Sequence, residues 1–335
     1  MSRYDGLIIP RSYSEYINKT DAATLQQALQ LSGVMSNIPT KDSSLPVKSG
    51  GVWNAIHAIS HNIPRVTPKD ITAYITDGSF WNRLAGTSGY ELFEDIYTGD
   101  YVKMSRPISA YERTGQYQST GSQYVTIAGL DTMMNNGDQG NGVDYHHAVM
   151  VPGQGFGGTQ HFGRSRMNAT NTTEGGYKAS EMNTTTIGAV ASTGSTAATA
   201  SINQQLYAEF GAHLKTVREM ISTSINASGY NRFGSASGCS NRFQWASVQA
   251  ILMSEVEVYG STVWSSSGFD TGTACKPLAL FQHSKIARNN RTAYYWLKDV
   301  ADSIRYCIVG GNGLAYFNSA SSANYYVRPR FILAA

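Results

Sequence analysis

The sequence predicts an α+β fold, in which helices and strands do not form a regular βαβ repeat. Two observations lead to this prediction. Short strand-like runs rich in Val, Ile and Tyr occur before and after the middle of the chain, and two segments between them have helical periodicity. With 335 residues, the chain can bury a sizeable core and corresponds to roughly two average domains.

The composition argues against several classes of protein. Lys and Arg total 26 and Asp and Glu total 23, for a net charge of +3, and there is no basic run, so nucleic-acid binding is not expected. No stretch approaches the ~18 apolar residues of a membrane span, and no signal peptide is expected. Charged residues make up 15%, whereas Gly (33) and Tyr (21) are frequent. A surface that is polar through hydroxyls and amides suits an extracellular location.

Residues 1–62 are predicted to form a separate N-terminal stem. Residues 20–21 can cap a short helix, a break rich in Pro and Ser follows at 38–46, and residues 52–63 form a second short helix candidate. Both helices are too short to fold alone, so we expect the stem to order by packing on copies of itself or on a scaffold. Residues 63–335 then form the globular domain.

The globular domain begins with strand-like runs. Residues 92–104 are expected to form a turn between two strands, and the continuous apolar runs at 123–130 and 147–152 predict buried strands. Residues 153–201 are rich in Gly, Asn and Thr and have few large apolar residues. This composition predicts long loops.

The clearest predicted helix spans residues 202–225 and is followed by Gly229 as a stop. A second, shorter helix is predicted at 246–259. Strand-like runs return in the tail, at 294–297, 306–309 and 327–333. The long helix is predicted because its apolar residues repeat at spacings of three and four: Ile202, Leu206, Phe210, Leu214, Val217, Ile221 and Ile225.

Gly153–Gly158 matches the G-x-G-x-x-G pattern of dinucleotide-binding loops letter for letter. Such a site also needs a helix that opens on the last glycine, so that its amides meet the pyrophosphate. Pro152 ends the preceding strand, and residues 159–163 do not begin a helix. The motif is therefore interpreted as a Gly-rich loop, and no cofactor is expected.

Asp144, His146, His147 and His161 lie close together in the sequence, which raises the question of a metal site. His146 and His147 are adjacent, so on a strand their side chains point to opposite faces and cannot both bind one ion. We interpret one of the two as a core histidine with satisfied hydrogen bonds, and we expect no metal.

The remaining candidates for chemistry are equally weak. His57 and His61 have i,i+4 spacing but no third ligand nearby, so they are interpreted as part of a polar helix face. Glu255 and Glu257 diverge on a helix and cannot act together as an acid–base pair. No catalytic residue is predicted, and the chain is not expected to be an enzyme. The cysteines are odd in number and lack metal-ligand spacing: Cys239, Cys275 and Cys307.

The most informative segment is 299–326, whose 28 residues contain no Lys, Glu, Gln, Met or Trp. Codons that end in a pyrimidine cannot encode these five types, so mutagenesis of adenines in Asn codons would produce such a set. The residues that do occur, among them Tyr, Ser, Asn and Gly, are typical of binding surfaces. An ordinary Gly/Ser/Asn-rich hairpin is the alternative interpretation.

Two short sequence motifs, which we call frames, lie on either side of this segment and resemble those of a known protein family. Tyr295–Ala301 and Val327–Phe331 resemble the W-L-x-D-V and V-R-P-x-F frames of retroelement-diversified phage receptor-binding proteins, such as the major tropism determinants. Leu252–Gly260 is similar to a core segment of C-type-lectin-like domains of the formylglycine-generating-enzyme type. Residues 38–43 and 49–52 are similar to phrases in the N-termini of phage tail fibres.

The resemblance implies a C-type-lectin-like domain with long loop insertions at 63–335 and a variable binding face at about 293–330. It implies structural roles for the frame residues Trp296, Leu297, Asp299, Val300, Val327, Arg328, Pro329 and Phe331. The ligand-binding residues that it implies are Tyr294, Asp302, Ile304, Arg305, Cys307, Val309, Asn312, Leu314, Tyr316, Asn318, Asn324 and Tyr325.

The resemblance further implies a homotrimer on the surface of a phage virion, facing outward. It would bind a receptor on a bacterial cell, either a protein or a glycan, and contact other virion proteins through residues 1–62. Nucleic-acid binding and membrane insertion are not expected. The alternative is a structural virion protein, such as a head fibre, decoration or baseplate component, with an invariant lectin-like domain. A third possibility, a carbohydrate-active hydrolase, would require a cleft with paired carboxylates.

Overall fold

The computed structural model describes residues 59–111, 120–138, 140–223, 243–265, 277–282 and 291–335. All but the first two of these residues belong to one compact unit, His61–Ala335. The predicted stem, residues 1–62, lies outside the described residues except for its last four. No described helix has both the length and the hydropathy needed to cross a lipid bilayer.

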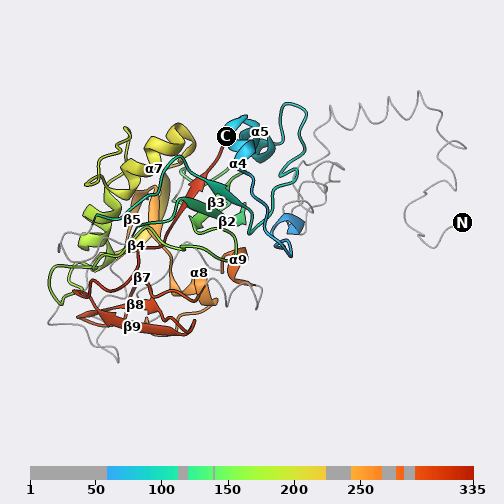
Figure 1. The fold of residues 1–335 in the computed structure, drawn as a ribbon. Coiled ribbons are helices and arrows are strands. Elements are labelled where there is room, and N and C mark those ends of the chain that lie inside the picture. The colour runs from blue at the N-terminus through green and yellow to red at the C-terminus, as the bar shows by residue number, and fades with distance from the viewer. Residues whose placement is uncertain (1–58, 112–119, 139, 224–242, 266–276, 283–290) are drawn as a thin grey trace, which may run out of the picture. The chain divides into compact units, whose positions relative to one another are not determined.

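The central element is a five-stranded antiparallel sheet (Figure 1). Its strands are β1 (Tyr101–Lys103), β2 (Tyr124–Leu130), β3 (Ala148–Pro152), β10 (Pro329–Leu333) and β6 (Ala250–Leu252), in that order across the sheet. The last strand of the chain, β10, therefore lies between β3 and β6 and is hydrogen-bonded to both. Every residue of β3 and β10 is buried, so both strands belong to the core.

Two smaller antiparallel sheets complete the unit. One contains β7 (Tyr295–Val300), β8 (Arg305–Val309) and β9 (Ala315–Ser319), with β8 in the middle. The other pairs β4 (Val217–Ser222) with β5 (Phe243–Val248). Helices and antiparallel sheets thus occur together, which confirms the α+β class. The strands predicted at 123–130, 147–152 and in the tail are also confirmed.

The helices are short, and two of them begin with a capping box. Ser201 and Gln204 form a reciprocal capping box at the start of α7, where two otherwise unpaired backbone N–H groups find acceptors. The helices are α4 (Thr72–Thr76), α5 (Ser79–Ala85), α6 (Gly176–Ala179), a π-helix (Met182–Gly188), α7 (Ile202–Phe210), a 3-10 turn (Gly211–His213), α8 (Glu255–Tyr259) and α9 (Ala279–Gln282).

The helix predicted at 202–225 is wrong from Gly211 to Thr223; residues 224–225 and the predicted stop, Gly229, lie outside the described residues. Gly211 has φ 55° and ψ −133°, a conformation that ends the helix, and the chain continues into β4. Val217 and Ile221 are four residues apart, a spacing that fits one face of a helix and also one face of a strand. The helix predicted at 246–259 is likewise wrong before Ser254, because residues 250–252 form β6 and only α8 is helical.

The loop prediction for 153–201 is wrong in part. The segment contains α6 and the π-helix, and it buries large apolar side chains that anchor it to the core: Phe162, Met167, Tyr177, Met182 and Ile187. In 92–104, a strand forms only at β1. The residues before it make turns in which Phe93 and Asp95 have φ of 56° and 54°.

A buried ion triad joins three elements of the core. Arg330 on β10 donates through Nη2 to Glu219 on β4 at 2.6 Å and through Nε to Glu257 on α8, and all three side chains are fully buried. Asn136 Nδ2 also donates to the Glu219 carboxylate at 3.1 Å. Burial alone would lower the pKa of Arg330, but the two carboxylates raise it, so the guanidinium stays charged.

Replacing Arg330 by Met should destabilise the protein strongly, because two buried carboxylates lose their counter-charge. We expect a loss of about 3–5 kcal/mol in the free energy of unfolding, measured by urea denaturation. The matched control is Arg218→Met on β4, whose ion pair with Asp138 is partly exposed, is screened by solvent and should contribute far less to stability. Equal losses in the two variants would contradict this assignment.

Candidate ligand-binding face

Ten of the twelve predicted ligand-binding residues reach the surface. Tyr294, Leu314 and Tyr316 are the most exposed large side chains among them, at 54%, 65% and 53%. Ile304, Asn312 and Asn324 are also exposed. The half-buried members are Asp302, Arg305, Asn318 and Tyr325.

The prediction is wrong for Cys307 and Val309, both of which are 0% exposed. Both residues lie on β8, which is paired with β7 on one side and β9 on the other, and Tyr306 and Ile308 on its opposite face are also buried. From Tyr306 to Val309 both faces of this central strand are covered, so these side chains are not available to a ligand. Strand alternation alone does not reveal which strand is central.

The eight frame residues are all buried and form the base below this surface. Trp296 Nε1 donates to the carbonyl of Ser165 at 2.7 Å. The Arg328 guanidinium lies 5.1 Å from the centre of the Tyr295 ring, a cation–π contact. The surface residues are thus carried by a packed layer whose aromatic and charged groups have partners.

Three tyrosines lie on this surface with Tyr325 next to the other two, and we call Tyr294, Tyr316, Tyr325 and Asn318 the tyrosine face. The Tyr294 and Tyr325 rings meet edge to face, with centres 6.2 Å apart. Asn318 Nδ2 donates to the Tyr325 hydroxyl. Burial raises the pKa of Tyr325, and the Tyr294 hydroxyl adds to this shift, so the hydroxyl stays protonated and can donate at neutral pH.

Backbone hydrogen bonds hold the tyrosine face in place. The Tyr326 N–H donates to the Tyr294 carbonyl at 2.8 Å, and the Trp296 N–H donates to the Tyr326 carbonyl at 3.0 Å. The Ser165 N–H donates to the Tyr325 carbonyl at 3.2 Å on the other side. Because residues 325–326 lie between two bonded segments, little conformational entropy remains to be lost when a ligand binds.

Trp264 extends the aromatic surface and was missed by sequence reasoning. Its Nε1 donates to the Ala315 carbonyl at 2.9 Å, and its ring centre lies 6.3 Å from Tyr316 and 4.7 Å from Phe317. The residue stands alone in a Ser-rich stretch without periodicity, so the sequence contains no signal that could have assigned it.

A cleft of about 740 Å³ adjoins the tyrosine face. It is lined by Phe156–His161 from the Gly-rich loop, by Thr292–Tyr294 and by Tyr326, so Tyr294 belongs to both the face and the cleft. No helix follows Gly158. This confirms the interpretation of Gly153–Gly158 as a loop rather than a dinucleotide motif.

His161 lines this cleft as a neutral, almost fully buried side chain. Its ring stacks on Tyr326 with centres 3.6 Å apart and planes 8° from parallel, and its Nδ1 accepts from the Gly163 N–H at 3.0 Å. Burial, together with the positive charges of Arg328 and Arg164, lowers the pKa of His161 to about 4. The imidazole is therefore uncharged at neutral pH.

Two further described histidines, His147 and His146, have structural partners. His147 is fully buried, as expected of a core histidine: its Nε2 accepts from the Met133 N–H at 3.1 Å, and burial lowers its pKa. His146 pairs with Asp131 at 2.6 Å, which raises the pKa of His146. Within the described ranges, no three His, Cys, Asp or Glu side chains gather as metal ligands would.

The polar helix face predicted for His57 and His61 is wrong for His61, and His57 lies outside the described residues. His61 is 4% exposed and stacks on Tyr97, with ring centres 4.1 Å apart. Cys239 and Cys275 also lie outside the described residues.

Glu255 and Glu257 are both fully buried and serve the fold. Glu255 accepts from the N–H groups of Val263 and Ser265 at 2.9 and 3.0 Å. Glu257 caps α8 and pairs with Arg330. The two carboxylates thus hold the backbone and the ion triad rather than forming an acid–base pair.

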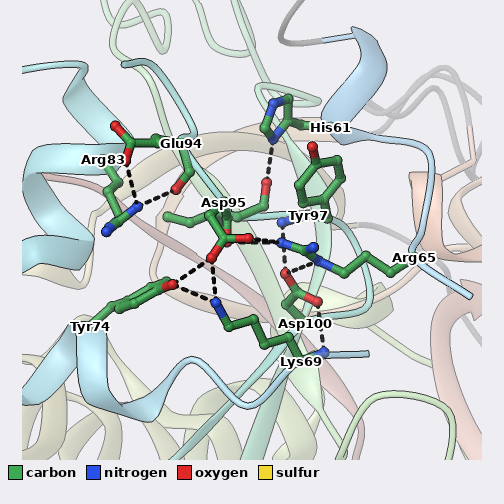
Figure 2. Close-up of polar contacts among 10 residues, drawn as sticks. His61, Arg65, Lys69, Tyr74, Arg83, Glu94, Asp95, Tyr97 and Asp100 are labelled. Atoms are coloured by element: carbon green, nitrogen blue, oxygen red, sulfur yellow. Dashed lines mark hydrogen bonds and ion pairs between the residues drawn. The ribbon is translucent and has the colours of Figure 1, made fainter. Parts of the chain in front are cut away.

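A second polar cluster, around Asp95, was not predicted from the sequence. Figure 2 shows Asp95 between Arg65 on one side and Lys69 and Tyr74 on the other; the Tyr74 hydroxyl donates to it at 2.6 Å. Burial would raise the pKa of Asp95, but the hydrogen bonds from Lys69, Tyr74 and Arg65 lower it well below its usual value. Every carboxylate oxygen is used, so we assign the cluster a structural role.

Comparison with known proteins gives no relative: no family model matches the sequence, and no curated protein or solved structure matches it either.

Lowering the pH should destabilise the protein partly through His161. Its pKa is about 4 when folded and about 6.5 when unfolded, so the unfolded chain binds more protons between these values and stability falls as the pH falls through them. Urea denaturation at pH 7 and at pH 4 gives the free energy of unfolding at each pH. Between these two pH values we expect this free energy to fall by up to roughly 3 kcal/mol less in His161→Asn than in the wild type. Identical pH dependence in both proteins would contradict this.

Proposed function

We propose that this chain is a receptor-binding protein of a phage virion that adheres to a bacterial surface through the tyrosine face. The proposal rests on one observation: in the tail, buried framework residues and exposed tyrosines lie close together in the sequence. Framework residues such as Trp296 and Phe331 are buried, while Tyr294 and Tyr316 are exposed on the same short stretch of chain. In this proposal the unit is a C-type-lectin-like domain, and its part is adhesion without chemistry.

The physical properties of the tyrosine face suit recognition. Tyrosine offers a large contact area with few rotatable bonds, and exposed aromatic side chains are frequent hot spots of binding energy. Substitutions at exposed positions usually change stability by less than about 0.5 kcal/mol. A scaffold of this kind therefore tolerates a variable surface, as retroelement diversification would require.

Several copies on one particle would strengthen a weak single site through avidity. We propose a homotrimer, held together and attached to other virion proteins through residues 1–62, with the tyrosine face directed away from the particle. Once one copy has bound the cell, the neighbouring copies are held close to it and bind as if intramolecularly. A modest affinity at each face is therefore sufficient for attachment.

Replacing Tyr294, Tyr316 and Tyr325 together by Ala should abolish adhesion and leave the fold intact. The fluorescently labelled full-length protein is incubated with a panel of intact Gram-negative and Gram-positive cells, and bound fluorescence is measured by flow cytometry. For any strain that binds the wild type, we expect at least about a tenfold loss of signal, because interface hot spots each contribute about 2 kcal/mol or more.

The matched control for the triple variant is Tyr207→Ala, a half-buried tyrosine on α7, a helix that lies apart from β7–β9 (Figure 1). It should bind as the wild type does. Adhesion of the triple variant at wild-type level, with an unchanged circular dichroism spectrum, would contradict the proposal and favour a structural virion protein.

A single small substitution should disturb the tyrosine face indirectly. A Cβ atom at Gly311 would lie 2.5 Å from Cε2 of Tyr294, so Gly311→Ala must displace this ring. We expect the variant to lose part of its adhesion to the same cells, with a thermal midpoint within a few degrees of the wild type. Tyr294 is mostly exposed, so its ring can move outward without disturbing the core. A large loss of stability with unchanged adhesion would contradict the assignment of Tyr294 to the binding surface.

A further inference from the structure

Positive charge lies close to the cleft beside the tyrosine face. None of the described residues that line the cleft is Asp or Glu. Burial lowers the pKa of His161 in the lining, and the charges of Arg328 and Arg164 add to this shift, so both guanidiniums act on the cleft wall. Arg291 directly precedes Thr292–Tyr294 of the lining. The cleft is therefore electrostatically suited to an anion.

Arg164 has no carboxylate partner among the described residues. Its guanidinium donates to the Tyr326 hydroxyl at 2.8 Å and lies 4.7 Å from the centre of that ring. Its Nε atom is buried and has no hydrogen-bond acceptor. Arg166, two residues further on, instead pairs with Glu181 at 2.9 Å. A half-buried cation with a neutral partner gains more from an anion in the adjoining cleft than a paired one does.

Two further guanidiniums contribute to the positive field. Arg328 is fully buried, 5.1 Å from the centre of the Tyr295 ring, and Arg291 lies 4.9 Å from the centre of the Tyr259 ring. Burial raises the pKa of Tyr295, and the charges of Arg328 and Arg291 oppose this shift. Both charges thus reach the residue that follows Tyr294. They act through protein rather than through water, so salt and solvent screen them little.

The lining narrows the kind of anion. The volume of about 740 Å³ lies within the range of about 300–1,000 Å³ found for ligand pockets, and Phe156, Tyr294 and Tyr326 contribute aromatic rings to it. An organic ligand with an apolar part fits such a wall better than a bare inorganic ion. No Lys or Arg lines the cleft itself, so a phosphate dianion would lose hydration without a direct ionic bond. A carboxylate carries a single charge and loses less.

We propose that this cleft binds a carboxylate carried by an acidic peptide segment of the receptor. The carboxylate lies near the wall formed by Tyr326 and His161, in the field of Arg164, and apolar parts of the peptide pack on Phe156 and Tyr294. Because Tyr294 also belongs to the tyrosine face, one peptide can contact both surfaces. This inference rests on the proposed adhesion function and makes the receptor a protein with an exposed Asp or Glu side chain.

The experiment compares two peptides that differ only in charge, N-acetyl-Tyr-Glu amide and N-acetyl-Tyr-Gln amide. Each is titrated into the full-length protein at pH 7, and Kd is measured by ligand-observed saturation-transfer NMR. In about 10 mM salt, we expect the Glu peptide to bind at least about fivefold more tightly than the Gln peptide. Glycerol 3-phosphate and galacturonic acid, titrated in the same way, test a phosphate and an acidic sugar as alternative anions.

Three variants locate the site. Arg164→Met should abolish the preference for the Glu peptide, whereas Arg166→Met, the matched control with its own partner Glu181, should keep it. Gly157→Leu tests the cleft without changing Arg164. Gly157 lines the cleft, does not have a positive φ, and a Cβ atom built on it meets no atom within 4 Å. The added side chain fills the cleft without backbone strain, so both peptides should bind at least about tenfold more weakly.

Several outcomes would overturn the inference: equal affinity of the wild type for the two peptides, an unchanged preference in Arg164→Met, undiminished binding in Gly157→Leu, or tighter binding of glycerol 3-phosphate or galacturonic acid than of the Glu peptide. Tyr316→Ala separates this inference from the proposed function, because Tyr316 belongs to the tyrosine face and does not line the cleft. This variant should keep peptide binding and lose adhesion to cells. In the wild type, adhesion without peptide binding refutes the cleft alone, and peptide binding without adhesion refutes the proposed function alone.

Discussion

The structure depends on the guanidinium of Arg330, which is held between two buried carboxylates. Through Glu219 and Glu257 it connects β10 to β4 and to α8, three elements that are far apart in the sequence. β10 also lies between β3 and β6 in the central sheet. A buried charge with both partners in place fixes the position of the strand, whereas the loss of one partner is costly. The end of the chain is therefore held firmly, and the segment just before it carries the tyrosines of the site.

The tyrosine face and the cleft share one structural base. Residues 325–326 are hydrogen-bonded to β7 on one side and to residues 164–165 on the other, which brings the Gly-rich loop next to Tyr294. Buried framework residues and exposed tyrosines therefore lie on the same stretch of chain, residues 294–331. The exposed side chains contribute little to the core, so their identity can change at small cost to stability.

Polar groups that looked like candidates for chemistry instead stabilise this unit. Glu255 holds the turn at 263–265, His147 is a core acceptor, and Asp95 anchors Arg65 and Lys69 (Figure 2). Each has its hydrogen-bonding capacity used within the fold, which is what a buried polar group requires. The lining of the cleft differs in kind, since it consists of aromatic rings, amide and hydroxyl groups and the neutral His161.

The sequence by itself determined the class of fold, the buried strands and the loop nature of Gly153–Gly158. Apolar runs and glycine patterns are local signals, and they require no knowledge of what packs against them. Only the tertiary structure decided that the helix ends at Phe210, that Cys307 and Val309 are buried, and that Trp264 adjoins the site. A spacing of four residues fits a helix and a strand equally. Whether a strand is central, or which distant ring meets it, depends on contacts between segments far apart in the chain.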